Sequence, residues 1–378
     1  MSGNGTTFRA GSTINMGPFA TAFVEAWSVN VLEDFVNIVS MGDRWEIIDE
    51  ASLDFSRNAL PLPYLNVVDS AKVVISSPYI SMDRLNCDDS VTLVINNDPS
   101  VGEYFLVQNF TINDRCVVNG SGYIEVTDTF NFTSGVVAGT ATTAQINVKG
   151  NTLLEANNAL PRVISGYRTV TVSGTALWNA KTLVASRLSV SDTTSTFQVT
   201  GTMELNAIYN LEMVGKGRFV VAGSVNCNSP GYGITFQTKF LDVAQTGVIS
   251  QTYGTAVNFA NEVFYSFGVL RGEALSEIHL LGKDFTFSSP SRVETLGDLV
   301  IDGSPLGVTF QSGTYIDIAG ELAIRGGSIA KVQNAVVLDL GAKVCILFLF
   351  YFLFFFIGFF PIPDFFSYFS QIPGEIIV

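Results

Sequence analysis

A four-residue pattern recurs along this chain of 378 residues and limits the folds open to it. The pattern is Val-x-Gly-Ser/Thr, and neighbouring copies near the centre lie 27 and 22 residues apart. The copies begin at Val118, Val137, Val172, Val199 and Val221, with a variant at Ile301. Apolar and polar residues alternate around them, which places one strand face in a core and the other in water. The glycine lets the chain turn a corner or pack tightly, so the pattern predicts a solenoid or propeller blades.

A longer repeat indicates how the coils follow one another. Gly120–Phe132 aligns with Gly166–Trp178 at an offset of 46 residues, about two coils, so that Ile124 matches Val170. No amphipathic helix of 10–15 residues separates the strands between residues 60 and 343, which excludes βαβ folds. We therefore predict an all-β fold, a right-handed parallel β-helix or a closely related β-solenoid.

The same patterns predict how the chain is organised. Residues 1–20 are rich in Gly, Ser and Thr and are expected to be an irregular segment. The β-solenoid is expected over residues 21–343, with its clearest repeats at 120–225. An apolar segment, 344–360, and a tail, 361–378, follow it.

The apolar segment leaves two interpretations open. Val344–Phe360 has 17 residues without a charge, eight of them Phe, and a run of ~17–25 apolar residues can span a bilayer as a transmembrane helix. Alternatively, these residues have T-rich codons and the last 35 residues are a translated intron. The given chain would then be a fragment of a longer one, and its tail should pack against nothing.

Charge and composition narrow the classes of partner. The chain has 20 Lys and Arg against 34 Asp and Glu, a net charge of −14. Such a chain repels phosphate backbones, so we expect no nucleic-acid partner. Charged residues are 14% of the chain, below the roughly 25% of ordinary globular domains, and Ser, Thr and Asn supply polar surface instead.

Four cysteines are present, without the close pairs typical of zinc sites. Cys87 and Cys116 lie 29 residues apart, about one coil, and either form a disulfide or remain two buried thiols. Cys227 and Cys345 have no evident partners.

The cellular location is indicated by two opposing signals. No apolar signal-peptide region is visible at the N-terminus. Four Asn-x-Ser/Thr sequons nevertheless predict a glycoprotein of the cell surface or extracellular space, whose true start would then lie upstream. Their asparagines are Asn4, Asn109, Asn119 and Asn131.

The block Thr169–Val225 resembles the repeats of parallel β-helix surface proteins with the pectin-lyase-like scaffold, such as autotransporter passenger domains and filamentous adhesins. The residues that carry the resemblance are Val172–Trp178, Val199–Leu205 and Leu211–Ser224. It covers about residues 60–343 and implies a role in surface structure or adhesion. Carbohydrate or cell-surface proteins are the partners it implies; it transfers no catalytic residue and no cofactor.

Polysaccharide lyases and hydrolases also use this scaffold, and their chemistry requires particular residues. Glycosidic hydrolysis needs two carboxylates that face one bond. Asp88 and Asp89 are adjacent, and adjacent side chains on a strand point to opposite faces, so we expect a solvated turn there. The single histidine, His279, is expected to be a half-buried strand residue rather than a base. We therefore assign no catalytic residue and no metal site.

Two further motifs have ordinary explanations. Gly215-Lys216-Gly217 lacks the Ser/Thr of a phosphate loop and is expected to be a turn between strands. Trp178, Phe132 and Tyr209 could form a sugar-binding strip, but core aromatics are the commoner explanation.

The sequence favours a non-enzymatic structural or adhesive protein, with a polysaccharide-active enzyme as the alternative. It also predicts the residues that should point inward and stack from coil to coil. These are Val170, Val172, Val199, Leu205, Phe219, Val221, Ile316 and Ile318.

Overall fold

The computed structural model describes the backbone of residues 60–332, apart from 77–78, 155–160, 181–185 and 327. It also describes the isolated strands on either side of that span that are given below. The chain forms two compact units, Met1–Thr202 and Met203–Val378, called unit 1 and unit 2.

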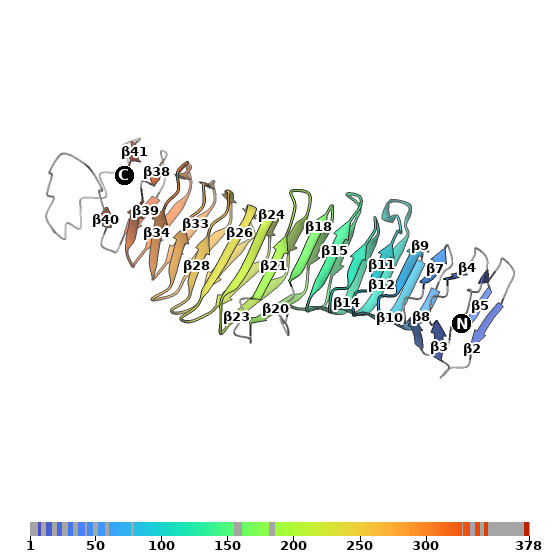
Figure 1. Cartoon of the computed structure of the whole chain (residues 1–378). Coiled ribbons are helices and arrows are strands. Elements are labelled where there is room, and N and C mark those ends of the chain that lie inside the picture. Colours follow the sequence, from blue (N-terminus) through green and yellow to red (C-terminus); the bar gives the residue numbers. More distant parts are fainter. Residues whose placement is uncertain are drawn as a thin grey trace. The chain divides into compact units, whose positions relative to one another are not determined.

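Most of the described chain is β-strand joined by short turns (Figure 1), and the one helix of that part is the 3₁₀ turn η1 (Pro99–Val101). The strands of unit 1 are β1 (Thr7–Phe8), β2 (Thr13–Met16), β3 (Thr21–Val24), β4 (Val29–Leu32), β5 (Asn37–Met41), β6 (Arg44–Ile47), β7 (Ser52–Ser56), β8 (Leu60–Val67), β9 (Lys72–Ser76), β10 (Tyr79–Cys87), β11 (Thr92–Ile95), β12 (Tyr104–Ile112), β13 (Val117–Asn119), β14 (Tyr123–Phe132), β15 (Gly135–Gly139), β16 (Gln145–Val148), β17 (Asn151–Leu153), β18 (Arg162–Gly166), β19 (Thr169–Val172), β20 (Thr175–Ala180), β21 (Ser186–Val190) and β22 (Thr196–Val199). Those that follow are β23 (Thr202–Ala207), β24 (Leu211–Val221), β25 (Ser224–Asn228), β26 (Gly233–Val243), β27 (Val248–Gln251), β28 (Ala256–Phe259), β29 (Val263–Ser266), β30 (Val269–Gly272), β31 (Glu277–Leu280), β32 (Asp284–Phe287), β33 (Arg292–Thr295), β34 (Asp298–Asp302), β35 (Val308–Phe310), β36 (Tyr315–Ile318), β37 (Leu322–Arg325), β38 (Ile329–Val332), β39 (Val337–Leu340), β40 (Val344–Ile346) and β41 (Gly374–Ile377).

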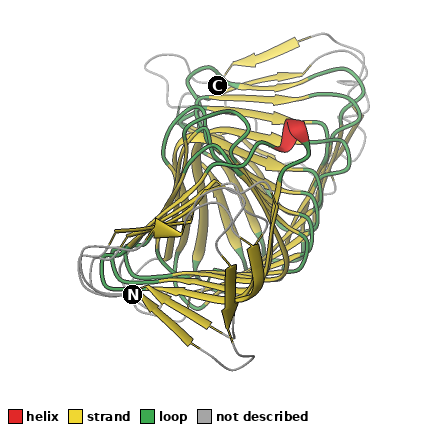
Figure 2. Ribbon diagram, turned by 90° about the vertical axis from the view of Figure 1, so that its right-hand side faces the viewer, coloured by secondary structure: helices red, strands yellow, loops and turns green. Residues whose placement is uncertain are grey.

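Each unit is a parallel β-solenoid, which confirms the predicted fold class. Within unit 1, Ile124 of β14 pairs with Ile146 of β16, and Ile146 pairs with Val170 of β19. The residues matched by the 46-residue offset are therefore two coils apart, as predicted. In the end-on view, strands of successive coils in each unit lie one behind another (Figure 2).

The core follows from the period-two alternation. In β19, Val170 and Val172 are buried while the Thr residues beside them are half-buried. All eight residues predicted to point inward are at most 2% exposed, which confirms the assigned strand faces. In unit 2 the rings of Phe219, Phe236 and Phe259 stack from coil to coil, with centroids 5.4 and 5.6 Å apart. Such stacks add to the area that each side chain buries.

Gly174 and Gly201, two glycines of the repeat, work by close approach. A Cβ atom on Gly174 would lie 2.0 Å from the carbonyl oxygen of Gly150, and one on Gly201 equally close to that of Gly174. Neither Gly174 nor Gly201 has a positive φ. Of the two roles the sequence allowed, tight packing is the one these glycines have, since any side chain would push the coils apart.

A buried arginine ties successive coils of unit 1 together. Arg168 is fully buried, and its guanidinium donates hydrogen bonds to the carbonyl oxygens of Ala138 at 2.7 Å and of Gly122 at 2.9 Å. Its Nη2 also donates to the carbonyl oxygen of Gly120 at 3.2 Å. Burial lowers the pKa of Arg168 to about 10. The carbonyls replace the water that the cation loses.

One local prediction, the turn at residues 215–217, is wrong, and another, the burial of Trp178 and Phe132, is confirmed. Gly215-Lys216-Gly217 lies inside β24, where the pairing register shifts between Gly215 and Arg218, so the predicted turn is wrong and the motif is a bulge within a strand. Trp178 and Phe132 are each 1% exposed. They are core aromatics, and the sugar-binding strip drawn through them does not exist.

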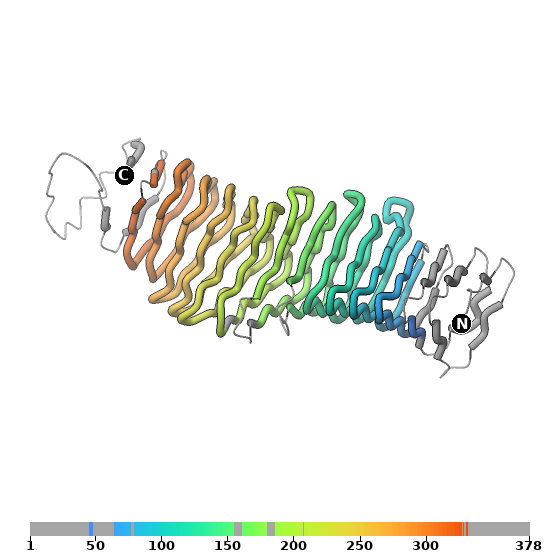
Figure 3. The backbone as a smooth tube through the Cα atoms, in the orientation of Figure 1, coloured from blue at the N-terminus to red at the C-terminus, as the bar shows by residue number. Residues whose placement is uncertain are grey.

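The two ends of the chain are only partly described (Figure 3). Strands β1 and β2 lie within the first 20 residues. Most of the 344–360 segment falls outside the described residues, and so does most of the 361–378 tail. No helix in the described part of the chain is both long and apolar enough to cross a membrane. Strand β40 pairs in parallel with β37, and β41 pairs antiparallel with β38. These pieces therefore contact the solenoid, contrary to the expectation that the tail packs against nothing.

Candidate ligand-binding groove

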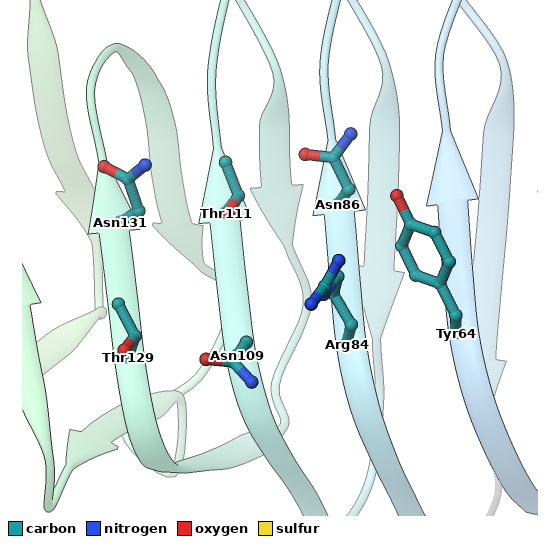
Figure 4. Close-up of a pocket in the computed structure, with 7 residues that line it drawn as sticks. All are labelled: Tyr64, Arg84, Asn86, Asn109, Thr111, Thr129 and Asn131. Carbon is teal, nitrogen blue, oxygen red and sulfur yellow. The ribbon is translucent and has the colours of Figure 1, made fainter.

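A shallow groove of about 390 Å³ lies on the outward face of four neighbouring strands of unit 1, β8, β10, β12 and β14. Figure 4 shows its side chains standing on adjacent parallel strands. They are Tyr64, Arg84, Asn86, Asn109, Thr111, Thr129 and Asn131. Every one has a polar atom, so the groove offers hydrogen-bond donors and acceptors along its length.

Strand register arranges these residues in two rows. In the first row, Arg84 pairs with Tyr64 on one side and with Asn109 on the other, and Asn109 pairs with Thr129. The second row runs through Asn86, Thr111 and Asn131 in the same way. Residues two apart on a strand share a face, which is why the rows lie side by side.

Part of the second row is already ordered by hydrogen bonds. Asn86 Nδ2 donates to Asn66 Oδ1 at 2.6 Å, and Asn66 Nδ2 donates to Glu46 Oε2 at 2.5 Å. Glu46 and Asn66 are both only 8% exposed. The buried carboxylate therefore fixes the orientation of the amides and leaves the Asn86 carbonyl oxygen facing the groove side of the ladder.

Arg84 supplies the only positive charge among the residues that line the groove. Its guanidinium carbon lies 5.5 Å from the centroid of the Tyr64 ring, a cation–π contact. Arg84 is exposed, and none of the ion pairs found among the described residues includes it. Its N–H groups are therefore open to a ligand's oxygen atoms.

The sequons lie in different places. Asn109 and Asn131 both line the groove. Asn119 is half-buried at the end of β13, and its Oδ1 accepts a hydrogen bond from the Gly120 N–H at 2.8 Å. Asn4 lies outside the described residues.

The residues that line the groove include no cysteine. Cys87 and Cys116 are joined through their sulfur atoms, with Cα atoms 5.8 Å apart. Cys227 is a buried free thiol whose pKa is raised, chiefly by burial. Cys345 belongs to β40, of whose side chains nothing is described.

The residues that line the groove include none of the candidate catalytic residues. Asp89 has a φ of 55° and Ser90 one of 62°, so the Asp88-Asp89 pair leads into a tight turn, as expected. His279 is half-buried on β31, with Nε2 2.7 Å from Glu277 Oε2. The described residues include no group of three His, Cys, Asp or Glu side chains placed to hold a metal ion.

Comparison with known proteins adds no name to this site. No family model, no curated protein and no solved structure matches the chain.

Proposed function

We propose that this chain is a non-enzymatic structural or adhesive protein of the cell surface or extracellular space, and that its groove binds carbohydrate. The observation that carries the proposal is the row of amides and hydroxyls beside Arg84, in which hydrogen bonds already orient Asn86. Sugar hydroxyls both donate and accept hydrogen bonds, and amide side chains do the same in a fixed plane. A groove whose partners are already oriented loses little conformational entropy on binding.

The structural part of the proposal is supported by polar ladders on the outward faces of both units. In unit 1, Ser173 Oγ donates to Asn147 Oδ1 at 3.1 Å, and Thr200 Oγ1 donates to Ser173 Oγ at 3.2 Å. In unit 2, Ser250 Oγ donates to Asn226 Oδ1 at 2.6 Å. Cross-strand pairs of this kind stabilise a sheet without an apolar surface. They suit a protein that stays rigid and soluble outside the cell.

The extracellular part of the proposal is supported by the joined cysteines and the sequons. Disulfides persist in oxidising compartments and are rare in the cytosol. The same compartments carry out N-glycosylation.

The test is a binding measurement on an array of immobilised glycans with the full chain. Asn86→Ala removes an oriented amide and Arg84→Ala removes the open cation, so each should weaken binding to the best glycan by roughly tenfold. Ser81→Ala is the matched control, because Ser81 is exposed on the same strand but outside the groove.

Two results would contradict the proposal. One is unchanged binding in both groove variants. The other is release of shortened products from a polysaccharide by the wild-type chain, which would favour the alternative of a polysaccharide-active enzyme.

A further inference from the structure

A row of tyrosines runs from coil to coil at one corner of unit 1, at the opposite end of β10 from the groove. Tyr79 and Tyr104 are register partners at the starts of β10 and β12, and each is 46% exposed. Their ring centroids are 5.3 Å apart in an edge-on arrangement. Tyr123 begins β14 and precedes Ile124, the partner of Phe105, so the row continues for a third coil.

The third ring is held in place by hydrogen bonds. The Tyr123 hydroxyl donates to Glu125 Oε2 at 3.1 Å and accepts from Asn147 Nδ2 at 3.2 Å. Tyr79 and Tyr104 brace each other through their ring contact. The row is therefore a rigid surface with little side-chain freedom left to lose when something binds.

Unit 2 carries a second row of the same kind. The rings of Tyr209 and Tyr232 lie 5.7 Å apart, just before β24 and β26. The next coil brings Tyr253, 59% exposed, into the turn whose Gly254 carbonyl oxygen accepts a hydrogen bond from the Gly231 N–H. Each unit therefore has tyrosine rings on three consecutive coils, two of them exposed and one half-buried, and exposed apolar clusters mark binding surfaces.

We propose that each of these two tyrosine rows binds an extended, neutral polysaccharide that runs along the coils of its own unit. The surface is separate from the groove, and the proposal rests on the proposed function only in that the chain meets carbohydrate. One ring per coil repeats at the strand spacing of roughly 4.8 Å, which calls for a ligand that is linear and repetitive. A phenol offers an apolar face and a hydroxyl, as a sugar ring does.

The carboxylates beside the two rows and the net charge of the chain favour a neutral ligand. Glu125 contacts the row of unit 1 through Tyr123, and Glu273 accepts a hydrogen bond from the Tyr253 N–H at 3.0 Å in the row of unit 2. The Glu273 carboxylate repels sulfated or uronate polymers at the row of unit 2, whereas Lys149 Nζ, 2.6 Å from Glu125 Oε1, offsets that carboxylate's charge at the row of unit 1. Both carboxylates accept hydrogen bonds from hydroxyl groups. The net charge of −14 adds a long-range term of the same sign.

The experiment is affinity electrophoresis of the full chain in gels that contain a β-1,4-glucan, a β-1,3-glucan, a mannan or polygalacturonate. At least one neutral polymer should retard the wild-type chain. The double variants Tyr79→Ala/Tyr104→Ala and Tyr232→Ala/Tyr253→Ala should each weaken that interaction by roughly tenfold, since each removes two stacking rings. Tyr79→Phe should keep most of it. Tyr265→Ala is the control, because Tyr265 is 42% exposed on β29 outside both rows.

Each adverse result has its own meaning. Retardation by polygalacturonate alone, by no polymer, or equally in wild type and both double variants overturns the tyrosine proposal. If Arg84→Ala then loses glycan-array binding while the double variants keep it, the groove stands without the rows. Self-association of the wild-type chain that the double variants lack would assign the rows to contacts between copies instead.

Discussion

At the scale of single residues, an odd or even position along the strand decides whether a side chain is buried in the core or faces water. Val172 is fully buried in β19, whereas Thr171, one position earlier, points outward beside its register partners Asn147 and Gln198. The two positions have similar volumes and the same strand neighbours. They differ in the medium around the side chain, water on one face and packed apolar groups on the other.

We expect Val172→Asp to lower the free energy of unfolding by several kcal/mol, because it places an unpaired charge among apolar side chains. Thr171→Asp should change it by about 0.5 kcal/mol or less, as surface substitutions do. Urea denaturation followed by circular dichroism measures both. Equal midpoints for the two variants would show that the strand faces are assigned wrongly.

The sequence alone predicted which strand positions face the core, because apolar and polar residues alternate there. Within β19, the alternation already placed Val170 and Val172 inside, and both are buried. The groove was not readable. Arg84 meets Tyr64 across 20 residues but Asn109 across 25, because a longer connection with η1 intervenes. Unequal coils hide such pairings from any fixed period.

At the scale of elements, hydrogen bonds in the turns also hold one coil to the next. Between β21 and β22, Asp192 Oδ2 accepts a hydrogen bond at 2.6 Å from the N–H of Gly166, a residue of β18 on the preceding coil. Thr194 Oγ1 donates to Asp192 Oδ1 and lies 2.6 Å from the Gly166 carbonyl oxygen. The Asp192 carboxylate therefore joins this turn to the preceding coil.

This carboxylate should make unit 1 sensitive to acid. Partial burial alone would raise the pKa of Asp192, but hydrogen bonds from Thr194, Gly166 and Ser191 outweigh it and hold the pKa below its ordinary value of 3.8. A lowered pKa in the folded state means stability that is present above pH 3.8 and is lost as pH falls through the folded value. Asp192→Asn should therefore melt at a lower temperature at neutral pH and lose less on acidification. Parallel melting curves for the two proteins at every pH would contradict this role.

The bulge in β24 shows where element-level reasoning from sequence fails. Gly-Lys-Gly interrupts the alternation, and both a turn and a bulge do that. Only the pairing of Leu211 with Ile234 before the interruption, and of Val221 with Val243 after it, shows that the strand continues. Local sequence carries no information on that partner strand.

At the scale of the whole molecule, the joined cysteines connect stability to the compartment in which the chain matures. The Cys87–Cys116 bond closes a loop of 29 residues, and a loop of that size stabilises a fold by about 3–4 kcal/mol in the chain-entropy account. We expect a chain made through a secretory route to give a linked Cys87–Cys116 peptide in a non-reducing digest, with Cys227 free. Cys87→Ser should lower the melting temperature of that protein. A digest with both thiols free would contradict the extracellular assignment.

Mapping which sequons carry glycans is an independent test that uses the same secreted protein. A glycan on Asn109 or Asn131 would fill the groove that these residues line, whereas one on Asn119 would leave the lining free. Peptide mass spectrometry before and after enzymatic deglycosylation should therefore find Asn119 modified and the other two unmodified. Full occupancy of Asn109 and Asn131 would remove the groove from consideration as a ligand site.

The glycine stack of unit 1 has a consequence for how such a chain changes over generations. Gly150, Gly174 and Gly201 each fit against a carbonyl oxygen one coil back, and Gly150 fits against that of Asp128. If the gene lost the segment from Gly150 up to the residue before Gly174, Gly174 would inherit the place of Gly150 against Asp128. Duplication of the same segment would work in reverse. The number of coils can therefore change by whole coils through recombination, while a loss that does not run from one such glycine to another would leave a side chain where only a hydrogen atom fits.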